Sequence, residues 1–78
     1  MGISDKIISL IMEALDDKTI HIDSTNETVV GWDSLGHLSI LSALDKATDG
    51  KVSEIRDFNE VSNVSQIVKL FEKHNLDL

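Results

Sequence analysis

The sequence predicts an all-α fold: a small bundle of three longer helices plus one short helix, with a long ordered loop between the first and second helices. Apolar residues recur at steps of three and four positions and do not alternate, which is the spacing of one face of a helix. The chain has 78 residues, of which 41% are hydrophobic and 27% are charged, so it can build one small core. We therefore expect residues 1–78 to form a single domain.

The first helix is expected over residues 4–15, and the loop follows it. Six apolar residues mark this helix: Ile3, Ile7, Ile8, Leu10, Ile11 and Leu15. Ser4 is placed to cap it, with Ile3 and Ile8 as a hydrophobic staple. Between Asp16 and Asp33 the helical spacing fades, which predicts the loop. Four isolated apolar residues are expected to hold the loop on the bundle: Ile20, Ile22, Val29 and Val30.

The second helix is predicted to begin at Ser34 with Asp33 as its N-cap, because Asp and Ser before an apolar run are typical of a helix start. Its apolar face is expected to be a stripe of four leucines: Leu35, Leu38, Leu41 and Leu44. Gly50 ends the pattern.

Two further elements are predicted after Gly50. The first is a single helical turn near Ser53–Phe58. The second is a last helix, with Ser62 or Asn63 as its cap. Four apolar residues at helical spacing mark this last helix: Val64, Ile67, Val68 and Phe71.

The charge of the chain limits its partners. Seven basic and fourteen acidic residues leave a net charge of −7. Such a surface repels phosphate backbones and attracts proteins with basic patches, so we expect protein partners and no nucleic acid. No apolar run approaches the roughly 20 residues that span a bilayer, and no signal peptide is recognisable, so membrane insertion is not expected. The absence of cysteine suits a reducing compartment. We expect a cytoplasmic monomer.

The octapeptide Gly31–Leu38 reads Gly-Trp-Asp-Ser-Leu-Gly-His-Leu. It resembles the prosthetic-group attachment site of the acyl carrier protein family, and the length, acidity and order of the predicted helices resemble that family over the whole chain. The resemblance implies that a phosphopantetheinyl transferase attaches 4′-phosphopantetheine from coenzyme A to Ser34, with Asp33 and Leu35 completing the site. It also implies that acyl groups are held as thioesters on this arm, and that acyl-loading and acyl-processing enzymes are the other partners. The protein would then be a carrier and not an enzyme.

Elementary chemistry at Ser34 agrees with that role. A serine at the first helical position lies beside unpaired backbone N–H groups and the positive end of the helix dipole, which favour a phosphodiester on its oxygen. The first turn also keeps the hydroxyl outside the packed core.

Four nearby residues are candidates for contact with the arm or with a partner: Trp32, His37, Leu38 and Asp45. Trp32 is either a recognition anchor for a partner or an N′ staple against His37 or Leu38. His37 lies three residues beyond Ser34, where it would either approach the phosphate or be solvated.

Two readings from other classes compete with the carrier. Asp45–Arg56 follows part of the EF-hand calcium-loop pattern, but Ala47 supplies no ligand at loop position three and Arg56 places a cation where the closing glutamate should be. We therefore assign no metal site. An unmodified helical interaction module stays open. A serine hydrolase is not supported, because no histidine–acid pair can be assigned around Ser34.

Within the resembled family, the motif favours a discrete acyl carrier over peptidyl or aminoacyl carriers, which commonly have Gly-Gly before Asp-Ser-Leu, although that alternative stays open. This chain has Gly31–Trp32 there. Gly36 and Ser39 occupy positions that are commonly acidic in fatty-acid carriers. The resemblance therefore implies a carrier of a specialised lipid, polyketide or other secondary pathway.

Overall fold

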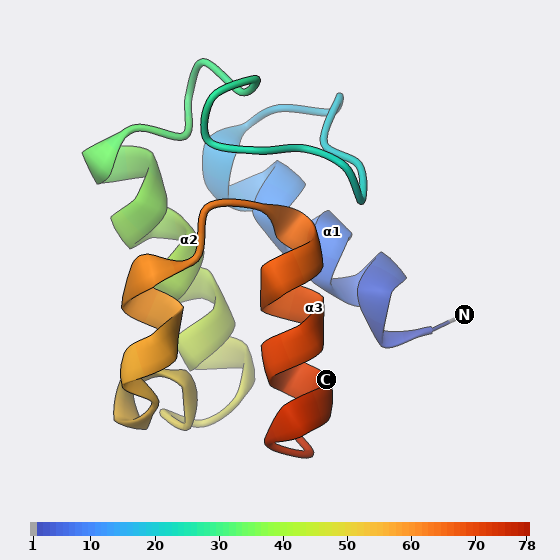
Figure 1. Cartoon of the computed structure of the whole chain (residues 1–78), viewed down its shortest axis with the longest axis vertical. Helices are drawn as coiled ribbons and strands as arrows, with labels where there is room; N and C mark the ends of the chain where they lie inside the picture. The colour runs from blue at the N-terminus through green and yellow to red at the C-terminus, as the bar shows by residue number, and fades with distance from the viewer. Residues whose placement is uncertain (1) are drawn as a thin grey trace.

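The computed structural model describes residues 2–78 and shows an all-α bundle, as predicted (Figure 1). Its elements follow one another as α1 (Ile3–Leu15), α2 (Ser34–Ala47), η1 (Val52–Glu54), η2 (Arg56–Glu60) and α3 (Val64–Lys73), where η denotes a 3-10 helix. The short helix predicted at Ser53–Phe58 is thus two 3-10 turns. Ile55 separates them, because its backbone is extended (φ −109°, ψ 107°).

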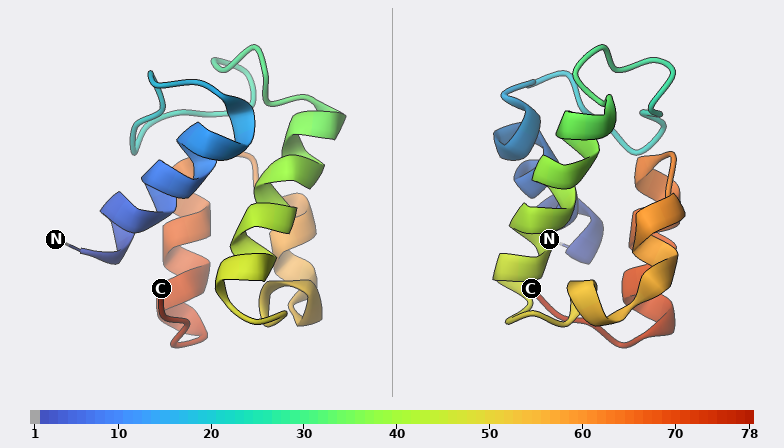
Figure 2. Two further views of the ribbon diagram at one scale, coloured as in Figure 1. Left: turned by 180° about the vertical axis from the view of Figure 1, so that it is seen from behind. Right: turned by 90° about the vertical axis from the view of Figure 1, so that its left-hand side faces the viewer.

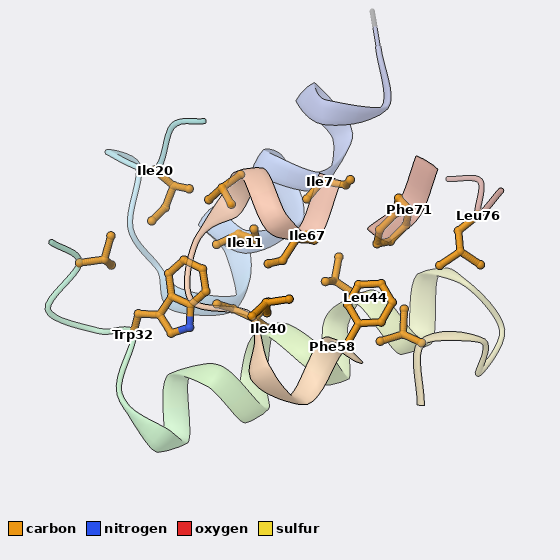
Figure 3. Close-up of a cluster of buried hydrophobic side chains, with 14 residues drawn as sticks. Ile7, Ile11, Ile20, Trp32, Ile40, Leu44, Phe58, Ile67, Phe71 and Leu76 are labelled. Atoms are coloured by element: carbon orange, nitrogen blue, oxygen red, sulfur yellow. The ribbon is translucent and has the colours of Figure 1, made fainter. Parts of the chain in front are cut away.

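The three α-helices enclose one hydrophobic core (Figure 3). α1 contacts both α2 and α3, while η1 packs on α2 and η2 on α3. The α-helices contribute most of the fully buried side chains: Ile7 and Ile11 from α1, Ile40 and Leu44 from α2, and Val64, Ile67 and Phe71 from α3. Phe58 of η2 meets Phe71 edge to face, with ring centroids 5.7 Å apart. That contact fixes η2 against α3.

Two helix starts illustrate how capping sets the element boundaries. α1 begins at Ile3 with Gly2 as its N-cap and no side-chain capping bond. The predicted Ser4 cap is therefore wrong, because Ser4 already lies inside the helix. For α3, Asn63 is the cap: its side chain accepts a hydrogen bond from the backbone N–H of Gln66 at 2.8 Å. Gln66 Oε1 accepts in return from the backbone N–H of Ser62 at 2.8 Å, which closes a reciprocal cap.

The loop of residues 16–33 lies across the end of the bundle where α2 and α3 begin (Figures 1 and 2). It is bound to the start of α3 through backbone hydrogen bonds. The N–H of Val64 donates to the carbonyl of Ser24 at 3.1 Å, and the N–H of Asn26 donates to the carbonyl of Ser62 at 2.8 Å. The loop is ordered by these contacts, and they place it beside the start of α2.

Of the four apolar residues expected to anchor this loop, two do so. Ile20 and Val29 are buried in the core. Ile22 is 40% exposed and Val30 is 98% exposed, so the expectation is wrong for both. The anchoring role passes instead to Trp32, which is 4% exposed, and to backbone pairing with α3.

Candidate functional site

The motif Gly31–Leu38 lies where the loop enters α2. Asp33 is the N-cap, and its Oδ1 accepts a hydrogen bond from the backbone N–H of Gly36 at 2.8 Å. Ser34 is the first helical residue and is exposed. The predicted helix start is confirmed. The first intrahelical bond runs from the N–H of His37 to the carbonyl of Asp33, so the N–H groups of the first turn before it have no partner within the helix ladder.

Gly36 is the point of closest approach between the loop and α2. It is buried, and a Cβ at this position would lie 1.9 Å from the carbonyl oxygen of Gly31 and 3.1 Å from Cδ2 of Leu15. Only glycine lets the loop return this tightly onto the helix. A side chain at position 36 would therefore not be available on the surface for a partner to contact. The comparison of Gly36 with acidic surface positions, made from sequence, does not hold for this reason.

The apolar face of α2 differs from the predicted leucine stripe. The buried residues are Gly36, Ile40 and Leu44, whereas Leu35 is 75% and Leu38 is 62% exposed. Steps of three residues fall about 60° short of a full turn, so a stripe built from them drifts around the helix. Of the four leucines, only Leu44 reaches full burial. The exposed leucines instead flank Ser34 on the surface.

Trp32 and His37 are bonded to each other. The indole Nε1–H of Trp32 donates to Nδ1 of His37, with 3.2 Å between the two nitrogens. Trp32 is part of the buried core (Figure 3), so it offers a partner almost no surface. His37 is half-buried, not solvated, and its Nε2 is the one buried side-chain nitrogen or oxygen in residues 2–78 that has no hydrogen-bond partner.

Ser34 borders an open groove with a volume of about 580 Å³. One wall is the start of α2, with Ser34, His37 and Leu38, and the other wall is the segment 59–62, which comprises the end of η2 and the two residues after it. Four of the residues predicted to surround Ser34 line this groove, namely Trp32, Asp33, His37 and Leu38, whereas Leu35 does not. Sequence reasoning missed the second wall. No spacing in the chain relates residues 59–62 to the motif, because they meet only through tertiary packing.

Asp45 does not belong to this groove. It lies eleven residues beyond Ser34, about 16 Å along the helix axis. Its Oδ1 accepts the backbone N–H of Ser53 at 2.8 Å, which ties η1 to the end of α2. The side chain that would be the first ligand of a calcium loop is thereby engaged. Across residues 2–78, no group of three or more His, Cys, Asp or Glu side chains is arranged to hold a metal ion.

Two further properties bear on the site and its surroundings. Within residues 2–78, none of the helices combines the length and apolar character that a bilayer-spanning segment needs. In the loop, hydrogen bonds from the Thr19 hydroxyl and from its backbone N–H lower the pKa of the exposed Asp17 carboxyl, because they stabilise its charged form.

Comparison of the chain with models of protein families, with curated proteins and with solved structures finds no match. Any functional assignment therefore rests on the residues of the chain itself.

Proposed function

We propose that this protein is an acyl carrier whose Ser34 holds a 4′-phosphopantetheine arm. The observation that carries the proposal is the position of Ser34: an exposed serine on the first turn of a capped helix, within the motif that resembles a carrier attachment site. Peptide N–H groups without helical partners surround that position and favour an anionic substituent.

The chemistry asks little of the chain beyond a nucleophile and a docking surface. The Ser34 hydroxyl oxygen would form a bond to the β-phosphorus of coenzyme A, and the bond from that phosphorus to the bridging oxygen would break. Adenosine 3′,5′-bisphosphate leaves, and the hydroxyl proton passes to a base of the transferase. The transferase must supply that base, since the nearest histidine, His37, has its Nδ1 engaged by Trp32 and its Nε2 buried. Acyl groups would then be carried on the thiol of the arm.

The groove beside Ser34 supports the same proposal. It begins at the attachment point and is lined by both polar and apolar groups, Leu38 and Val61 among the latter. A flexible arm attached to Ser34 would have a surface along which to lie. Tethering in this way raises the effective concentration of the acyl group at each partner enzyme.

The surface of α2 favours a specialised pathway over central fatty-acid synthesis. Between Asp33 and Asp45, α2 carries no acidic residue, and its exposed side presents Leu35, Leu38 and Ser39. A partner with a basic docking patch would be attracted only weakly to this face of α2, because such attraction depends on opposite charge. Partners of this carrier are therefore expected to use apolar contacts near Ser34. Once loaded, the protein should be a poor substrate for fatty-acid synthase enzymes, and equal turnover with their own carrier would contradict the specialised role.

The attachment is tested by intact mass spectrometry after incubation with coenzyme A, magnesium and a broad-specificity transferase. The parent protein should gain one phosphopantetheine and Ser34→Ala none. Ser39→Ala is the matched control, because Ser39 is an exposed serine on the same helix and its removal should leave the addition unchanged. Circular dichroism should report the same helix content for all three. A parent protein that stays unmodified would favour an unmodified interaction module, and modification of Ser34→Ala would place the arm elsewhere.

A further inference from the structure

The bond between Trp32 and His37 fixes the protonation state of the histidine. An indole N–H can only donate, so Nδ1 of His37 must accept with a free lone pair. The proton of the neutral ring then sits on Nε2, which is buried and meets no acceptor. The arrangement is compatible with neutral His37 alone, because a protonated ring would turn an N–H toward the indole N–H.

This bond spans the segment that carries Ser34. Trp32 precedes the N-cap Asp33, and His37 lies in the first turn of α2. Two side-chain hydrogen bonds cross this helix start: the Trp32–His37 bond and the bond from the Gly36 N–H to the capping Asp33. If the Trp32–His37 bond is lost, the first turn of α2 is held by the Asp33 cap and by the packing of Trp32.

A protonated His37 has a different set of partners available. Two charged residues line the groove beside it, Asp33 at the helix start and Glu60 at the end of η2. On the Trp32 side the neighbours are the apolar residues of the core. Charge thus draws an imidazolium away from Trp32 and toward the groove.

We propose that the Trp32–His37 hydrogen bond is a pH-sensitive latch on the helix start that carries Ser34, closed when His37 is neutral and open when it is protonated. Trp32 and His37 would be positioning residues, acting on Ser34 through the order of the first turn. The latch itself stands on the structure alone. Its consequence for arm attachment rests on the proposed carrier function.

The latch is tested directly by NMR on the nitrogen-15-labelled full chain. A coupling across the N–H···N bond should join Trp32 Nε1 to His37 Nδ1 at about pH 8 and be lost at about pH 5, the range in which histidine changes charge. Fluorescence of Trp32, the sole tryptophan, should follow the same transition.

Three variants separate His37 from other titrating groups. In His37→Gln, an amide oxygen can accept from Trp32 at every pH, so the fluorescence transition should vanish. Trp32→Phe, which keeps an aromatic ring without the N–H, should abolish the coupling. His21→Gln is the matched control: the exposed His21 also accepts through Nδ1, from the N–H of Asp23 at 3.2 Å, but lies outside the groove. This variant should behave as the parent does. A coupling that persists at about pH 5, or a transition retained in His37→Gln, would overturn the latch.

The link to Ser34 is measured as the ratio of pantetheinylation rates of parent and His37→Gln, which cancels the pH dependence of the transferase. The ratio should be near one at about pH 8 and fall about fivefold at about pH 5, the size expected for loss of one hydrogen bond. A ratio that does not change with pH would refute the link to Ser34. If the latch opens and closes by NMR while the parent is never modified, the proposed function fails and the latch stands.

Discussion

Replacing Gly36 by alanine should destabilise the fold, although alanine is the better helix former. The added Cβ would lie 1.9 Å from the carbonyl oxygen of Gly31, and ordinary van der Waals contact begins at 3.4 Å. The loop must therefore move away from α2 by about 1.5 Å. The obstacle is backbone, so no side-chain rotation can relieve the clash. Leu15 at 3.1 Å limits movement in a second direction.

The net effect follows from two opposing terms. Overpacking of this severity costs about 3 kcal/mol, at the upper end of the usual range, because backbone must shift. Helix propensity returns about 1 kcal/mol. We expect the free energy of unfolding of Gly36→Ala to fall by about 2 kcal/mol, which for a domain of this size lowers Tm by roughly 8–16 °C.

Urea denaturation followed by circular dichroism measures this change, with Gly31→Ala as the matched control. No atom lies within 4 Å of a Cβ added at Gly31, and its φ is not positive. That variant should stay within about 0.5 kcal/mol of the parent. If Gly36→Ala proved as stable as Gly31→Ala, the close packing of the loop on α2 would be refuted. The role of Gly36 in permitting the close approach of the loop would then also be wrong.

Two further predictions concern hydrogen bonds outside the groove. Thr48 is 5% exposed and its hydroxyl accepts the N–H of Val52 at 3.3 Å, so Thr48→Val should cost about 1–2 kcal/mol in urea denaturation by leaving that N–H unpaired, and Thr48→Ser should cost less. In the loop, Thr19→Val should raise the pKa of Asp17 part of the way to its ordinary value in an NMR titration, since the hydroxyl donor is lost and the backbone donor stays. Because folding lowers the pKa of Asp17, the charged carboxylate stabilises the folded state above about pH 4, and this stabilisation is lost as the pH falls through the folded pKa. The stability of Thr19→Val should therefore decrease less than that of the parent over this acidic range. An unchanged Asp17 titration would refute the assigned cause.

The helices were predictable from sequence because each carries a local signal. α3 has apolar residues at regular helical steps and a capping Asn63 with Gln66 three residues later, and α2 has Asp33 before Ser34. The α2 face was not predictable from the leucine spacing alone, since leucines occur around much of its circumference. The residue that decides the buried face is Gly36, which has no side chain and so leaves no mark in an apolar pattern.

The loop contacts were out of reach of sequence analysis for a different reason. Ser24 and Val64 pair through backbone groups, and backbone hydrogen bonds do not depend on which side chain a residue carries. The second wall of the groove, residues 59–62, depends in turn on this pairing and on the packing of Phe58 against Phe71. Local patterns hold no information on such contacts between distant segments.

Within the motif, the residues divide by burial in a way that their sequence order hides. Ser34, Leu35 and Leu38 are exposed, while Trp32 and Gly36 between and beside them are buried. A change in partner specificity can therefore arise at the exposed leucines with little effect on folding. Changes at Trp32 or Gly36 act first on the junction between loop and helix, and on Ser34 only through it. Loss of modification in a Trp32 or Gly36 variant would consequently say nothing about recognition unless the helix start were shown to be intact.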